Sequence, residues 1–159
     1  MKIVDIEKKI IETLSGSVSK SDTIYIETDL VRFKSIFKYF KETEIFCNFF
    51  FEIFKKLIGK EGNIIFPTFS YSWGDNSKNK IFDVVKTLPQ TNLFSEFLLK
   101  QNAVRNFDPM FSFGVIGDSN FFFDKKCRSS FGKRSVFEKI IQKKIKLIHL
   151  GIEKYDPTI

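Results

Sequence analysis

Hydrophobic and polar positions along the chain alternate between helical and strand spacing. Isoleucine and leucine recur every three or four residues from Ile3 to Leu14, which predicts a helix with one apolar stripe. A wider apolar face covers residues 43–58, where Thr43 is the expected N-cap and Gly59 the expected stop. Shorter helices are predicted near Leu30, from Asn92 to Lys100, at 121–123 and from a capping box at Ser135.

Short runs of β-branched and aromatic residues lie between these helices and predict strands. They are residues 23–26, 64–66, 111–116 and 145–152. Helices and strands that alternate along a chain indicate an α/β fold. We therefore expect a layered α/β/α architecture with a central, largely parallel or mixed sheet, built as one domain over residues 1–159.

Polar side chains follow two of the predicted strands. The run that begins at Asn63 breaks at Pro67 and continues through hydroxyls and aromatics to Trp73. It is either a core strand with an irregular loop or the wall of a small-molecule site at a sheet edge. Thr28 or Asp29 caps the helix that follows the first strand, and backbone N–H groups at such a start can hold an anion or a carbonyl oxygen. The polar segment 74–91 is the expected substrate-binding loop.

Composition narrows the class of protein. The 159 residues include 43% hydrophobic and 28% charged residues, which indicates a soluble, globular chain with a core of its own. The net charge of +7 would attract the phosphates of a nucleotide cofactor or simply form a solvated lysine surface. Basic residues do not cluster with aromatics on one element, which disfavours nucleic-acid binding.

Cysteine and histidine are scarce. The two cysteines, Cys47 and Cys127, do not have the spacing of a metal-binding motif, so no metal site is predicted. Unlinked cysteines are typical of a reducing compartment, which predicts a cytoplasmic location. Cys47 is expected to be a packed thiol in the core. No apolar run is long enough to span a membrane. The only histidine, His149, lies within a predicted strand, a position more typical of a structural residue than of a catalytic one. Phosphate-binding glycine loops and a nucleophile elbow are absent from the sequence.

Six segments in order resemble the aminoglycoside 3-N-acetyltransferase family of acetyl-CoA-dependent enzymes. The resemblance rests on DTIYIETDL (22–30), GNIIFPTFSYS (62–72), FD (82–83) with LFSEF (93–97), AVRNFDPMFSFGVIG (103–117), FGKRSVF (131–137), and LG (150–151) with Thr158. The family has similar motifs in the same order: a strand ending in His-Ser/Thr-Ser/Asp-Leu, a Met-Pro-Thr-Phe stretch, an Ala-Val-Arg segment with His-Pro-x-His, and a Phe-Gly-x-x-Ser turn.

The chain also departs from the family pattern. Glu27, Asp108 and Phe111 stand where the family has histidines. Acetylation of an amine requires removal of the ammonium proton, and Asp108 could accept it only if desolvation favoured its protonated form. The family continues beyond Thr158 with a histidine and a glutamate, so the domain is expected to be incomplete at its C-terminus relative to the family.

The resemblance implies a site and a direct acetyl transfer from acetyl-CoA to an amine of an aminoglycoside or other amino sugar, as in antibiotic resistance. Acetyl-CoA is expected along the loop after the first strand, bound by Thr28, Asp29, Leu30, Val31 and Thr68. The acceptor is expected near Tyr71, Ser112, Phe131 and Gly132. Arg105 is equally consistent with phosphate binding and with a structural hydrogen-bonding role, and Ser135 is more typical of a helix cap.

Two other functions remain open at this point. A decayed relative would at most bind CoA without turnover. A basic nucleic-acid-binding module is the reading from another functional class.

Overall fold

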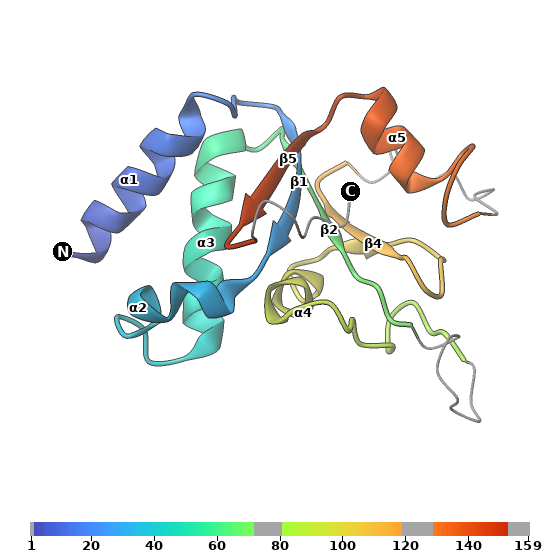
Figure 1. Ribbon diagram of the computed structural model, residues 1–159, viewed down its shortest axis with the longest axis horizontal. Helices are drawn as coiled ribbons and strands as arrows, with labels where there is room; N and C mark the ends of the chain where they lie inside the picture. Colours follow the sequence, from blue (N-terminus) through green and yellow to red (C-terminus); the bar gives the residue numbers. More distant parts are fainter. Residues whose placement is uncertain (1, 72–80, 119–128, 153–159) are drawn as a thin grey trace.

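A five-stranded mixed sheet forms the centre of the computed structural model, which describes residues 2–71, 81–118 and 129–152 (Figure 1). The strands are β1 (Thr23–Thr28), β2 (Asn63–Pro67), β3 (Val104–Arg105), β4 (Phe113–Ile116) and β5 (Lys146–Leu150), in the order β3-β4-β2-β1-β5. β1 runs parallel to both β2 and β5, whereas β4 runs antiparallel to β2 and β3. The predicted α/β class and mixed sheet are confirmed.

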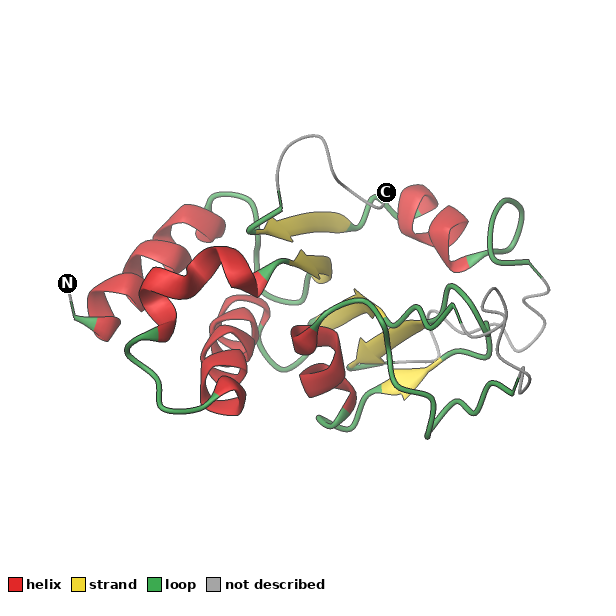
Figure 2. Cartoon of the chain, turned by 60° about the horizontal axis from the view of Figure 1, so that its bottom comes forward, coloured by secondary structure: helices red, strands yellow, loops and turns green. Residues whose placement is uncertain are grey.

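A thick apolar layer covers one face of the sheet, where α1 (Ile3–Ser15), α3 (Thr43–Ile58) and α4 (Leu93–Leu99) pack (Figure 2). Its core combines Ile24 and Ile26 of β1 with a phenylalanine-rich face of α3. Phe50 is fully buried there, and its ring lies 5.2–5.4 Å from the rings of Phe33, Phe46 and Phe49. Much of the unusual phenylalanine content is therefore core packing.

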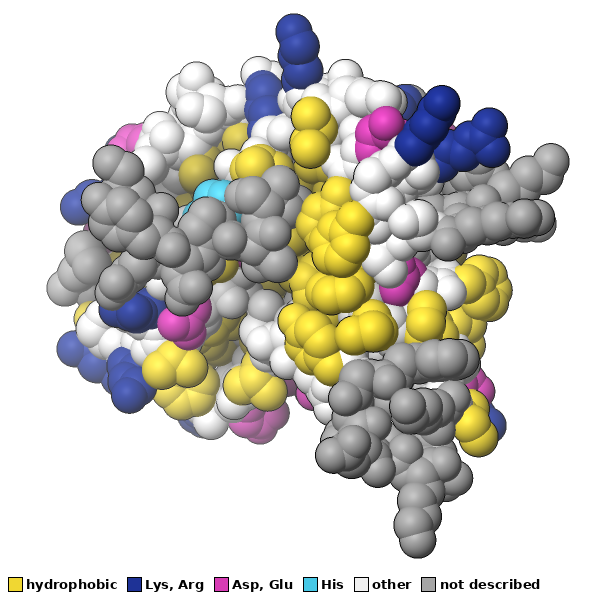
Figure 3. Space-filling view, turned by 45° about the vertical axis from the view of Figure 1, so that its right-hand side comes forward, with side chains coloured by type: hydrophobic (Ala, Val, Ile, Leu, Met, Phe, Trp, Pro, Cys, Tyr) yellow, Lys and Arg dark blue, Asp and Glu magenta, His cyan; other side chains and the backbone are white. Residues whose placement is uncertain are grey.

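The opposite face is covered by α5 (Val136–Gln142) and by aromatic side chains from loops. Tyr25 of β1, Ile65 of β2 and Phe113 of β4 form its buried layer against α5. Hydrophobic side chains gather across the side of the molecule brought forward in Figure 3, where the imidazole of the only histidine also reaches the surface. Helices on both faces complete the predicted α/β/α layering.

Two helix ends follow the expected capping chemistry closely. Asn92 accepts a hydrogen bond from the Ser95 amide at 2.8 Å, and Gly59 ends α3 with a φ of 73°. Ser135 accepts from the Glu138 amide at 3.1 Å, but the returning Glu138 carboxylate binds the Arg134 amide, so the predicted capping box is only half formed. The N-cap prediction for α3 was wrong, because the cap position is Glu42 and Thr43 is already helical.

Local turns account for the other differences from prediction. The helix expected near Leu30 is a 3-10 turn, η1 (Leu30–Phe33), followed by the short α2 (Lys34–Phe37). The predicted strand 111–116 begins only at Phe113, because Asp108 Oδ1 accepts the Met110 and Phe111 amides at 2.9 and 2.8 Å and holds both residues in a turn. The predicted helix at 121–123 lies outside the described residues.

The sequence also predicted a packed thiol at Cys47 and the absence of a membrane-spanning segment. Cys47 is a buried free thiol, and burial raises its pKa to about 11. No helix in the described part of the chain has the length and apolarity that a membrane crossing requires.

Candidate active site

Two adjoining cavities open at the carboxyl ends of β1, β2 and β5. One has a volume of about 300 Å³ and a largely polar lining that includes Glu27, Asp29, Arg32, Tyr71, Gln90 and Asn92. The other, of about 490 Å³, has a largely apolar lining that includes Leu30, Val31, Phe37, Phe46, Leu93 and Phe94. Both are also lined by Thr28 and Thr91, so they form one groove along the strand ends.

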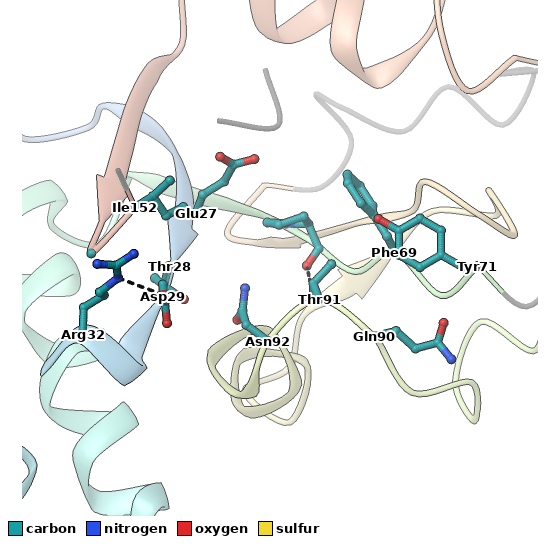
Figure 4. A pocket seen from close by; sticks show the side chains of 12 residues that line it. Glu27, Thr28, Asp29, Arg32, Phe69, Tyr71, Gln90, Thr91, Asn92 and Ile152 are labelled. Carbon is teal, nitrogen blue, oxygen red and sulfur yellow. Dashed lines mark hydrogen bonds and ion pairs between the residues drawn. The ribbon is translucent and has the colours of Figure 1, made fainter. Parts of the chain in front are cut away.

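The two walls of the groove come from distant parts of the sequence. Figure 4 shows Asp29 and Arg32, which follow β1, facing Thr91 and Asn92, which precede α4. Thr91 is tied to the end of β2 by its hydroxyl, which donates to the Pro67 carbonyl at 3.2 Å, and the Gln90 amide donates to the Phe69 carbonyl at 2.7 Å. The second wall is thus attached to the central strand of the sheet.

Thr28 lies where the two cavities meet. Its side chain is buried, with 6% of the residue exposed, yet among the described residues its Oγ1 has no hydrogen-bond partner. Burying a hydroxyl without a partner carries a free-energy cost of about 1–3 kcal/mol. A ligand in the groove that offered a donor or an acceptor at this point would remove that cost.

Three of the backbone amides expected to bind an anion after β1 are already engaged, those of Asp29, Val31 and Arg32. The Asp29 amide donates to the Leu150 carbonyl at 2.8 Å, and the Arg32 amide donates to the Asp29 carbonyl at 3.2 Å. The Val31 amide donates to Asp29 Oδ1 at 3.1 Å, so Asp29 is the cap of η1. Thr28 and Asp29 line both cavities, while Leu30 and Val31 line the apolar one, so these residues offer the ligand contacts at this wall.

A buried carboxylate in the lining of the polar cavity pairs with the only histidine of the sequence, which is not itself part of that lining. Glu27 is 2% exposed and lines the cavity, and its Oε1 accepts a hydrogen bond from the Tyr25 hydroxyl at 2.7 Å. Its Oε2 lies 3.2 Å from Nδ1 of His149. Burial and the neighbouring carboxylate raise the pKa of Tyr25, so its hydroxyl stays a donor to Glu27.

Sequence analysis missed this pairing, because it placed His149 on a strand without its neighbour. The parallel register of β1 and β5 sets Glu27 opposite His149. The sequence places Glu27 directly after one predicted strand and His149 within another, but it does not say that these two strands are neighbours in the sheet.

Arg105 anchors a second buried network behind the groove. Its Nε lies 3.1 Å from Thr68 Oγ1 and 3.0 Å from Ser112 Oγ, and its guanidinium also donates to the carbonyls of Thr68 and Thr87. Burial lowers the pKa of Arg105 to about 10, so it is charged at neutral pH, and the guanidinium carbon lies 4.9 Å from the centre of the Phe82 ring. Of the two readings left open for Arg105, these contacts support the structural one.

Thr68 and Ser112, expected to contact cofactor and substrate, are both fully buried. The Ser112 hydroxyl donates to the Thr68 carbonyl at 2.7 Å, and the two hydroxyl oxygens lie 3.0 Å apart. Neither residue lines the two cavities described above. The network joins β2, β3 and the start of β4, and supports the groove from behind.

The other predicted site residues divide between the groove and its surroundings. Tyr71 lines the polar cavity, and its ring centre lies 6.0 Å from that of Phe111, which in turn packs on Phe131 at 4.7 Å. Gly132, at a φ of 73°, accepts a hydrogen bond from the Ser135 hydroxyl at 2.7 Å, so both residues belong to the turn before α5. Asp108 is occupied by the two amides of its own turn and does not line either cavity.

The described segments contain no set of side chains that could bind a metal ion. Within residues 2–71, 81–118 and 129–152, no group of three or more His, Cys, Asp and Glu side chains is arranged to hold a metal ion.

Comparison with known proteins identifies both a family and a fold. The sequence model of the family described as aminoglycoside 3-N-acetyltransferase matches residues 33–159. The fold is similar to a crystal structure of aminoglycoside acetyltransferase AAC(3)-IIb, with a TM-score of 0.69 and 17% identity over 92% of this chain and 58% of that one. No curated protein sequence matches the chain.

Two ligand-bound structures of similar fold are also among the matches. AAC-IIIb as a binary with CoASH has a TM-score of 0.69 at 14% identity, and AAC-VIa bound to sisomicin has 0.68 at 15%. Each match covers 90% of this chain and 58% of the other. The chain thus spans less than two thirds of the length of these proteins.

Proposed function

The chain belongs to the aminoglycoside 3-N-acetyltransferase family, and we propose that it transfers an acetyl group from acetyl-CoA to an amine of an aminoglycoside or another amino sugar. The groove at the strand ends has the two chemically different halves that such a transfer needs. Among proteins of similar fold, AAC-IIIb is known as a binary with CoASH and AAC-VIa with bound sisomicin, which supports both ligand classes.

The apolar cavity is suited to the pantetheine arm of acetyl-CoA. Leu30, Val31 and Leu93 offer it apolar contacts, and Thr28, Asp29 and Asn92 supply polar atoms at one end. Lys34 also lines this cavity and supplies a positive charge for a CoA phosphate. Thr28, Asp29, Leu30 and Val31 keep their proposed cofactor-binding role, whereas Thr68 would act only through the buried network.

The polar cavity is suited to a cationic acceptor. Its lining includes two carboxylates, Glu27 and Asp29, and one guanidinium, Arg32, whose Nε lies 3.5 Å from Asp29 Oδ2. Amino sugars carry ammonium groups that carboxylates attract. Tyr71 offers an aromatic face for the sugar ring.

The free thiol Cys47 fits the reducing cytoplasm that we propose as the location of this reaction.

One observation carries the proposal: the unpartnered Thr28 hydroxyl stands between the two halves of the groove. The thioester of acetyl-CoA and the acceptor amine must meet at such a junction. A hydroxyl there can donate to the thioester carbonyl oxygen, where negative charge develops during attack.

Release of free CoA thiol tests the proposal. Purified protein with acetyl-CoA and a panel of aminoglycosides and amino sugars should release thiol only when an amine acceptor is present. Thr28→Val, which removes the hydroxyl and keeps the shape, should lower kcat/KM by about tenfold to a hundredfold. Thr13→Val is the matched control, because the Thr13 hydroxyl binds the Lys9 carbonyl on the exposed side of α1.

The alternatives predict other outcomes. Thermal stabilisation by acetyl-CoA without thiol release from any acceptor would indicate a relative that binds CoA without turnover. A salt-dependent mobility shift with generic DNA, without stabilisation by acetyl-CoA, would indicate the nucleic-acid module.

A further inference from the structure

We propose that Glu27 and His149 form the acid–base pair of the groove, in which His149 takes the proton from the acceptor amine and Glu27 orients it. The proposal deepens the acetyl transfer described above and rests on it. It assigns chemistry to Glu27, which stands in place of a family histidine, and to His149, the only histidine of the chain.

The sheet itself fixes the pair. Glu27 and His149 are register partners on parallel neighbouring strands, so their side chains project from the same face. The buried Ile26 and Ile148 also form a register pair and belong to the core on the opposite face. The pairing therefore does not depend on a loop conformation.

Because the Glu27 carboxylate is buried, its stability depends on its hydrogen-bond donors. Its side chain is only 3% exposed, and a carboxylate so far from water needs hydrogen-bond donors. The Tyr25 hydroxyl supplies one at 2.7 Å, and the His149 ring supplies another with Nδ1 at 3.2 Å. A carboxylate held in this way fixes the ring orientation and favours the tautomer with the proton on Nδ1.

The second ring nitrogen is then left to accept a proton. With Nδ1 turned toward Glu27, Nε2 of the neutral ring carries the lone pair. The His149 side chain is 30% exposed, so a solute can reach it. His149 is not itself in the lining of the polar cavity, but its partner Glu27 is, as are Gly151 and Ile152 directly beyond the end of β5, so the imidazole adjoins that lining through Glu27.

The step balances without any further reagent. Nε2 of His149 takes one proton from the acceptor ammonium, and the freed nitrogen lone pair forms a C–N bond with the thioester carbonyl carbon. The C–S bond breaks, and its electron pair leaves on the CoA sulfur. The second amine proton goes to that thiolate to give the CoA thiol, and the imidazolium returns its proton to solvent.

His149→Asn separates catalysis from structure, because the asparagine amide can still donate to Glu27 but cannot accept the ammonium proton. We expect kcat for thiol release to fall by at least about a hundredfold, while thermal stabilisation by acetyl-CoA stays within error of the parent. Glu27→Gln should lower kcat as well, and Tyr25→Phe should lower it less. A His149→Asn variant with kcat within twofold of the parent overturns the proposal.

A second measurement does not depend on turnover. Since the chain has one histidine, nitrogen NMR of labelled protein reports on a single imidazole. At a pH where the ring is neutral, we expect the proton on Nδ1 in the parent and a shift toward Nε2 in Glu27→Gln. A proton on Nε2 in the parent overturns the pair even if thiol release succeeds. The expected tautomer without thiol release would instead point to failure of the acetyl-transfer function.

Discussion

The two faces of the sheet use aromatic side chains in different ways. Beneath α1, α3 and α4, phenylalanines pack against one another and against aliphatic side chains in a core of buried hydrophobic residues. On the face beneath α5, aromatic rings lie around polar groups that are themselves buried, namely the Tyr25 hydroxyl and the Glu27 carboxylate. The first arrangement stabilises the fold, and the second positions the groups that face or support the groove.

The most direct test of this difference between the two faces is a substitution at Phe50. Phe50→Ala removes a fully buried ring that packs on three others, and we expect a loss of about 3–5 kcal/mol in the free energy of unfolding. The matched change on the other face is Phe131→Ala, where the residue is 53% exposed and the expected loss is about 1 kcal/mol. Urea denaturation measures both, and equal losses would contradict the division between the faces.

Arg105 tests whether polar burial also contributes to stability. Arg105→Met keeps much of the side-chain volume but removes the guanidinium donors from the carbonyls of Thr87 and Thr68, of which Thr68 keeps the Ser112 hydroxyl, so we expect a loss of about 2–4 kcal/mol. Arg105→Lys keeps the charge without the planar fork and should fall between the parent and Arg105→Met. A methionine variant as stable as the parent would show that the network is dispensable for folding.

The smallest effect is expected far from the groove, at Asp22. The Lys146 ammonium, 2.6 Å away, lowers the pKa of Asp22 below its unfolded value of 3.8. The folded state therefore gains stability above about pH 4 and loses it as the pH falls through the folded pKa. Asp22→Asn should cost about 0.5 kcal/mol at pH 7 and progressively less as the pH falls through the folded pKa, measured by urea denaturation across this range. A cost that does not decline on acidification would contradict the ion pair.

The sequence predicted the layers of the fold because periodicity reports burial. Residues 43–58 and 23–26 show their spacing plainly, and both elements form where expected. The direction of β4 could not be read in this way, since alternation is the same in parallel and antiparallel strands. The late start of β4 reflects a side-chain choice, because Asp108 takes amides that a strand would have used.

The site was predicted less completely, since motifs identify segments and not contacts. Thr28 and Tyr71 line the groove, whereas Thr68 and Ser112 come from equally suggestive motifs and face Arg105 instead. A glutamate was noticed at position 27 only as a missing histidine. His149 stands beside Glu27 because β5 is the neighbour of β1 in the sheet. A single sequence does not contain the order of the strands.

The pairing of β1 with β5 also sets when the site can come into being. It brings Lys146 beside Ile24 and lets the Lys146 ammonium donate to Asp22, 124 positions away, so it closes one of the longest loops in the chain. Contacts between such distant residues tend to form late in folding. Glu27 and His149 can meet only after that closure, so an unfinished or partly unfolded chain lacks the acid–base pair even where α3 and its phenylalanines have already packed.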